Sequence, residues 1–61
     1  MKELDVVRLK YDFQGISAGT IGTIVLEYDG TAFEVEFTDN DGETIDVLTT
    51  PAEKIELVIA C

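Results

Sequence analysis

The feature that most constrains the fold of this chain is a series of short apolar segments separated by turn-forming residues, roughly every ten residues. The clearest segment is residues 32–38, in which Phe33, Val35 and Phe37 alternate with glutamate. Such alternation is typical of a strand that packs one face on the core and exposes the other to water. Several short strands at this spacing favour an all-β sandwich or barrel.

The same reasoning predicts five strands joined by loops and turns. They are residues 5–10, 22–28, 32–38, 43–49 and 54–59. Asp29 and Gly30 predict a type I′ hairpin, because both central positions of that turn require positive φ. Thr50, Pro51 and Glu53 have the residue types of an N-cap, a first helical position and a capping box. We therefore expect one 3₁₀ turn before the last strand.

A chain of 61 residues holds a single domain, residues 1–61. Its pattern predicts a small five-stranded SH3-like barrel, an architecture that limits exposed sheet edges. Phe13 and Ile16 are expected to tuck under the long first loop, and Gly19 and Gly22 suit a bend or a close backbone approach at the second strand. The expected core is Val7, Leu9, Ile24, Leu26, Phe33, Val35, Phe37, Ile45, Val47, Ile55 and Leu57.

The charge balance narrows the classes of partner. There are 13 acidic and 4 basic residues, for a net charge of -9. Binding to nucleic acid depends on Lys and Arg neutralising phosphates, so nucleic acid is disfavoured, and so is an anionic membrane. A neutral or basic protein partner fits this charge better. No apolar run is long enough for a membrane span and residues 1–5 lack a signal-peptide core, which predicts a cytoplasmic protein.

Residue types suited to catalysis and metal binding are scarce. The chain has no histidine, and its single cysteine, Cys61, therefore has no histidine to activate it. A His/Cys zinc site is excluded, and we expect no cofactor and no enzymatic activity. Residues 39–43 resemble a calcium loop, but an EF-hand with its glycine at Gly42 needs acidic residues where Phe37 and Leu48 stand. A hairpin turn is the favoured interpretation.

Aromatic and acidic side chains are the candidates for a partner-binding surface. They are Tyr11, Phe13, Tyr28, Glu34, Glu36 and Asp46. In SH3-like domains the first loop and neighbouring aromatics can form a peptide groove. The glutamates, with Asp46 if it joins their face, would form an acidic stripe that docks a basic protein. The alternatives are that the aromatics cap the core and that the acids provide solubility and protect a sheet edge.

Five blocks of the sequence resemble one protein family when taken in order. They are residues 3–9, 15–25, 33–37, 42–44 and 48–52. They are similar to those of domain of unknown function 4926, a family of small acidic bacterial proteins. The resemblance implies a compact SH3-like fold and an occasional position beside toxin-like genes. It implies no activity and therefore no site residues.

Residues 22–25 and 34–37 bear a looser likeness to SH3-like barrels of larger enzymes, such as the β-subunit of nitrile hydratase, and to KOW-type nucleic-acid modules. The shared residues are framework, so they transfer a fold and not a site. The favoured hypothesis is a non-enzymatic protein-interaction module. Three alternatives remain. They are an antitoxin or immunity protein that binds a basic toxin, an accessory subunit of an enzyme and, less favoured, a KOW-type nucleic-acid module. Self-association through an open strand edge and apolar residues 58–60 also stays open.

Overall fold

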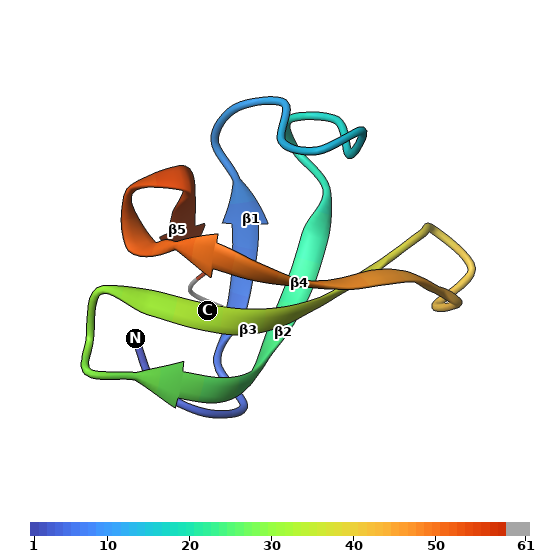
Figure 1. Cartoon of the computed structure of the whole chain (residues 1–61). Coiled ribbons are helices and arrows are strands. Elements are labelled where there is room, and N and C mark those ends of the chain that lie inside the picture. The colour runs from blue at the N-terminus through green and yellow to red at the C-terminus, as the bar shows by residue number, and fades with distance from the viewer. Residues whose placement is uncertain (59–61) are drawn as a thin grey trace.

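A computed structural model describes residues 1–58 of the chain (Figure 1). Its elements are β1 (Val6–Leu9), β2 (Ile21–Tyr28), β3 (Ala32–Thr38), β4 (Thr44–Pro51), the 3₁₀ helix η1 (Ala52–Lys54) and β5 (Ile55–Leu57). This order confirms an all-β chain with a 3₁₀ turn before the last strand. Ile59, which the sequence assigns to the last strand, and Cys61 lie outside the described residues. None of the helical structure in residues 1–58 is long and apolar enough to span a membrane.

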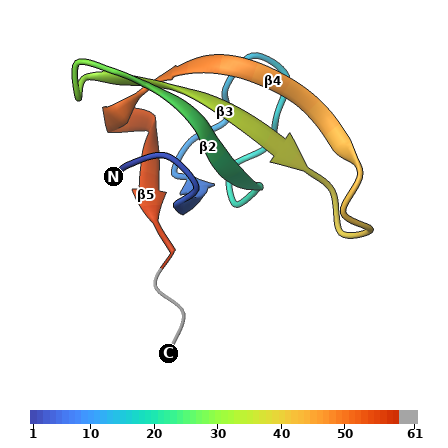
Figure 2. The same cartoon turned by 90° about the horizontal axis from the view of Figure 1, so that it is seen from below.

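The five strands form one antiparallel sheet in the order β4-β3-β2-β1-β5. The first and last strands are neighbours, because Leu9 pairs with Ile55. The sheet curls strongly, with β3 and β4 arching over the side where β1 and β5 lie (Figure 2). Among residues 1–58 no ladder joins β4 to β5, so the sheet is not closed and a barrel is not confirmed.

The core lies on the concave side of the sheet. Its buried apolar side chains are Val7, Leu9, Ile16, Ile24, Phe33, Val35, Phe37 and Ile55. All of these except Ile16 belong to the core expected from strand periodicity. Ile16 comes from the long loop, where Phe13 also packs against the core, so the expected tucking of these two side chains is confirmed.

Four residues that were expected in the core are instead exposed to water by 43% to 50%: Leu26, Ile45, Val47 and Leu57. The reason for Leu26 is a β-bulge in β2. Ile24 pairs with Val35, but Leu26 pairs with Glu34, so Val25 is an extra residue that reverses the alternation. Leu57 pairs with buried Val7 but ends the short edge strand β5, where no further strand covers it.

The alternation in β4 is the reverse of the expected one. Val35 pairs with Leu48 and Phe33 pairs with Thr50, so from Asp46 onward the even-numbered residues lie on the side of the core. A second bulge lies in β4. Phe37 pairs with Asp46 and Thr38 pairs with Thr44, so Ile45 has no partner in β3. The expectation that Ile45 and Val47 face inward is therefore wrong.

Thr50 does not cap the 3₁₀ helix. Its side chain is fully buried, and its hydroxyl donates to the Leu48 carbonyl oxygen at 3.1 Å. Pro51 occupies the N-cap position, without a side-chain hydrogen bond, so the predicted capping box is wrong. The type I′ turn is confirmed, because Asp29 and Gly30 have φ of 42° and 83°.

Candidate functional site

The three aromatic residues predicted to form a groove do not come together. Phe13 exchanges backbone hydrogen bonds with Ile16, at 2.8 and 2.9 Å, and packs on the core. Tyr11 is exposed in the same loop. Tyr28 lies at the far end of β2 from this loop, because β2 begins at Ile21. Phe13 thus caps the core, and the two tyrosines belong to separate surfaces.

The side chains of Lys10 and Lys54 both lie over the ring of Tyr11. The Nζ atoms of Lys10 and Lys54 lie 5.9 and 5.7 Å from the centre of its ring, within the range of cation–π attraction. The backbone N–H of Lys10 also donates to the Lys54 carbonyl at 2.8 Å. These contacts attach the start of the long loop to the 3₁₀ helix and place positive charge at that point.

Glu34 accepts hydrogen bonds from two hydroxyl groups. Tyr28 Oη donates to Glu34 Oε2 at 2.8 Å, and Thr49 Oγ1 donates to Glu34 Oε1 at 2.9 Å. The hydrogen bond to Glu34 raises the pKa of Tyr28 above its ordinary value, with smaller contributions from desolvation and from the negative charge of the carboxylate. The carboxylate is therefore held in one orientation on the outer side of the sheet.

Glu36 lies on the same side as Glu34, but Asp46 does not. Thr44 Oγ1 donates to Glu36 Oε2 at 2.6 Å. Asp46 pairs with Phe37, whose side chain points into the core, so Asp46 is on the opposite side from the two glutamates. Its carboxylate accepts the Val47 backbone N–H at 2.8 Å. The stripe thus contains two carboxylates, and Asp46 does not join it.

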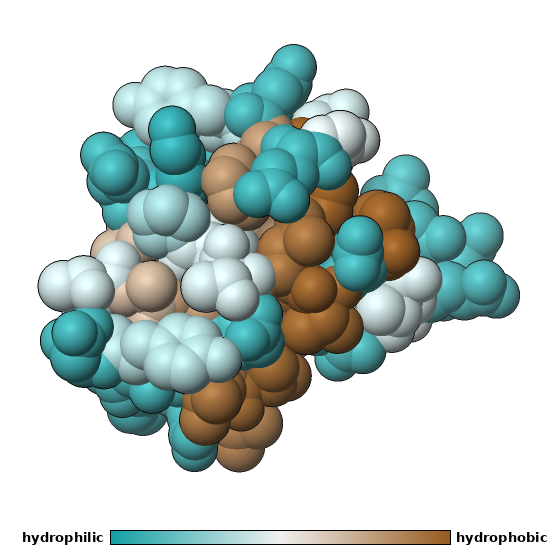
Figure 3. All heavy atoms as spheres, in the orientation of Figure 1, coloured by the Kyte–Doolittle hydropathy of each residue, from teal (hydrophilic) through white to brown (hydrophobic). Residues whose placement is uncertain are grey.

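Apolar side chains surround the two glutamates on the convex side of the sheet. We call this surface the outer face and define it by Val6, Ile21, Leu26, Glu34, Glu36 and Val47. Its four apolar members are 39% to 46% exposed. Figure 3 shows apolar side chains gathered where β4 and β3 pass in front of β2. Sequence periodicity placed Leu26 and Val47 in the core because no sequence signal marks the two bulges.

The β3–β4 connection is a turn organised by one carboxylate. Asp39 Oδ1 accepts the backbone N–H groups of Asp41 and Glu43, at 2.9 and 3.0 Å, and Gly42 has a φ of 83°. The hairpin interpretation of this segment is confirmed. In residues 1–58 no three His, Cys, Asp or Glu side chains are grouped so that they could hold a metal ion.

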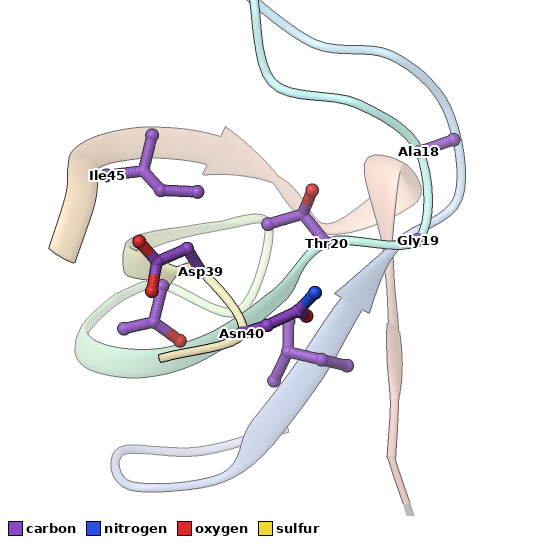
Figure 4. Close-up of a pocket in the computed structure, with 8 residues that line it drawn as sticks. Ala18, Gly19, Thr20, Asp39, Asn40 and Ile45 are labelled. Carbon is purple, nitrogen blue, oxygen red and sulfur yellow. The ribbon is translucent and has the colours of Figure 1, made fainter. Parts of the chain in front are cut away.

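A pocket of about 400 Å³ opens between the end of the long loop and the β3–β4 hairpin (Figure 4). It is lined by Ala18, Gly19, Thr20, Ile21, Thr38, Asp39, Asn40 and Ile45. This pocket is not predictable from the sequence, because the two segments that line it lie in different loops and neither has a recognisable motif. Its lining combines aliphatic side chains with oxygen-bearing ones.

A family model described as Domain of unknown function (DUF4926) matches residues 3–57. No curated protein and no solved structure matches the chain. The match covers every strand of the sheet, and its description assigns no activity to any residue.

Proposed function

The chain belongs to the DUF4926 family, and from this premise we propose that it is a small non-enzymatic module that binds a protein partner through its outer face. The observation that carries the proposal is the set of apolar side chains exposed around Glu34 and Glu36. Clustered apolar surface of this kind marks interaction sites more often than scattered single residues do. Binding would remove it from water, which contributes roughly 25 cal/mol for each Å² buried.

The two glutamates would orient the partner. Their carboxylates are held by the hydroxyls of Tyr28, Thr49 and Thr44, so little side-chain entropy is lost when a partner donor arrives. A carboxylate can accept about four hydrogen bonds, and Glu34 uses two within the described residues. Each glutamate therefore keeps acceptor capacity for a partner.

The net charge of -9 favours a neutral or basic partner, which would be steered to the surface electrostatically. We propose a cytoplasmic protein that requires no cofactor and binds neither nucleic acid nor membrane. An antitoxin or immunity role, in which the partner is a basic toxin, is the sharper form of this proposal. Co-expression with a neighbouring toxin-like gene tests that form, and unchanged toxicity would contradict it.

We also propose that the curled sheet is a variant of the SH3-like barrel. The antiparallel order and the 3₁₀ turn before β5 support this relation.

Site-specific photocrosslinking in the source cell tests the interaction. A benzophenone amino acid placed at Val47, which is 46% exposed on the outer face, should form one dominant covalent adduct with a protein. The same group at Glu53, which is exposed on η1 and away from the outer face, is the matched control. A third negative charge at the face, introduced as Leu26→Glu, should abolish the adduct formed at position 47. Equal crosslinking from both positions, or none from Val47, would refute the proposal.

A further inference from the structure

The pocket between the long loop and the β3–β4 hairpin has aliphatic surface on two of its lining elements. Ile21 of β2 and Ile45 of β4 both line it, and they are 39% and 50% exposed. Its volume of about 400 Å³ is near the lower end of ligand pockets, which run from about 300 to 1,000 Å³. This size fits one long side chain of a partner. Ile21 is also a member of the outer face, so the pocket adjoins the surface proposed to bind the partner.

Two side chains of the hairpin supply oxygen acceptors to the same pocket. Asp39 Oδ1 is occupied by two backbone N–H groups, whereas Oδ2 receives no hydrogen bond from the residues that the structure describes. The Asn40 amide also has no hydrogen-bond partner in that part of the chain. Figure 4 shows Asn40 between Asp39 and the loop segment that carries Gly19 and Thr20.

The negative charge of Asp39 is not balanced by a cation of the described chain. The ion pair formed within residues 1–58 joins Arg8 to Glu56 at 2.7 Å. Lys10 and Lys54 lie over the ring of Tyr11. The pocket therefore combines aliphatic walls with an uncompensated carboxylate and a free amide oxygen.

We propose that this pocket receives an arginine side chain of the protein partner. The inference rests on the proposed function and names the chemistry that its partner presents. The aliphatic stem of arginine would pack against Ile21 and Ile45. The planar guanidinium offers five donors and no acceptor, and it would donate to Asp39 Oδ2. Lysine is a poorer match, because its ammonium is a compact, more strongly hydrated point charge without the planar fork of donors.

Titration with a capped amino acid tests the pocket without the partner. N-acetyl-arginine methylamide, added to the ¹⁵N-labelled chain at about 0.15 M ionic strength, should shift the amide resonances of residues 18–21 and 38–45. The citrulline analogue has nearly the same shape and no charge, and it should bind about tenfold more weakly because the charge-assisted hydrogen bond is lost. Equal binding of the two compounds, or shifts spread evenly over the acidic surface, would overturn the inference.

Two aspartates of one hairpin provide matched variants. Asp39→Asn keeps an oxygen that can accept the two backbone N–H groups, and it should reduce arginine binding about tenfold. Asp41→Asn removes the same charge two residues away, outside the pocket lining, and should change binding less than about threefold. An equal loss of arginine binding in both variants would show that the acidic surface attracts arginine non-specifically, and it would refute a specific site. If arginine fails to bind while the Val47 crosslink persists, the inference falls and the proposed function stands.

Discussion

Gly22 lies directly against Val35, so closely that a Cβ atom at position 22 would come within 2.6 Å of Val35 Cγ1. The same Cβ would lie 2.9 Å from Phe37 Cδ1 and 3.1 Å from the Glu36 carbonyl oxygen. Contacts this short do not occur without displacement of the neighbours, and one of these neighbours is backbone. The close approach expected where β2 begins is thus present, and it allows β2 to pack tightly on β3.

Substitution Gly22→Ala should therefore destabilise the protein by about 1–3 kcal/mol, the usual cost of an overpacked core. Denaturant unfolding followed by circular dichroism would measure the free energy of unfolding. In the double variant Gly22→Ala/Val35→Ala the cost should be less than the sum of the two single costs, because the shortest contact is removed. Additive costs would show that Val35 is not the obstacle.

The bulge at Val25 predicts opposite behaviour for two neighbouring aliphatic residues. Ile24 is fully buried, so Ile24→Val should cost about 0.5–1.5 kcal/mol. Leu26 is 43% exposed on the outer face, so Leu26→Thr should change stability by only about 0.5 kcal/mol. Denaturant midpoints of the two variants provide the comparison, and a larger loss at Leu26 than at Ile24 would show that the bulge is misplaced.

Asp39 should contribute to stability through its carboxylate oxygen. Substitution Asp39→Ala removes the acceptor of two backbone N–H groups and should cost about 1–2 kcal/mol. Asp39→Asn keeps an acceptor and should cost less than about half as much. Thermal unfolding of both variants is the measurement, and an equal loss in the two would assign the effect to charge instead of to the turn.

The lowered pKa of Asp29 predicts that stability falls at acid pH. The Thr31 hydroxyl, at 2.7 Å, and the Thr31 backbone N–H, at 3.3 Å, hold the pKa of Asp29 below its ordinary value of 3.8. Since the folded pKa is the lower one, the stabilisation is present above pH 3.8 and is lost as the pH falls through the folded pKa. In Thr31→Val the larger cause is removed, so the pKa measured by carboxyl ¹³C NMR should rise toward 3.8. An unchanged pKa would contradict the hydrogen bond.

The raised pKa of Tyr28 predicts that stability falls at alkaline pH. Its pKa is raised above 10.0 chiefly by the hydrogen bond to Glu34, so the stabilisation is present below pH 10.0 and is lost as the pH rises through the folded pKa. Absorbance at alkaline pH would follow Tyr28 alone in a Tyr11→Phe background, since the chain has two tyrosines. Glu34→Ala should lower the measured pKa toward 10.0. Thr49→Val, which removes the other donor to Glu34, should leave it raised.

The fold was predictable from the sequence wherever apolar and polar residues alternate without interruption along a strand. Residues 32–38 alternate without interruption, and β3 occupies the same residues. Gly22 and the Asp29-Gly30 turn were also predictable, because their conformations are available to few residue types. In β4 the apolar residues Ile45 and Val47 are exposed, whereas Asp46 and Thr50 lie on the side of the core. There the pairing with β3 and the bulge decide the inward face, and neither is encoded within the strand itself.

The candidate site was less predictable than the fold, for a related reason. Glu34 and Glu36 were correctly placed on one side of a strand, because two residues of β3 separated by one must share a face. Asp46 could be assigned only from the register between β3 and β4. The pocket requires Thr20 and Asn40 to meet, and these residues approach each other only after β2 and β3 have paired.

The pairing of β1 with β5 determines when the protein can complete its fold during synthesis. Arg8 and Glu56 are partners across this ladder although 48 positions separate them. While residues 55–57 are still inside the ribosomal exit tunnel, Leu9 has no Ile55 beside it and one side of β1 has no ladder. The nascent chain can form the hairpins from β2 to β4 before residues 55–57 leave the tunnel, so the ladder between β1 and β5 is the last to form. A pause in translation before residues 55–57 emerge would prolong the period in which that side of β1 has no partner strand.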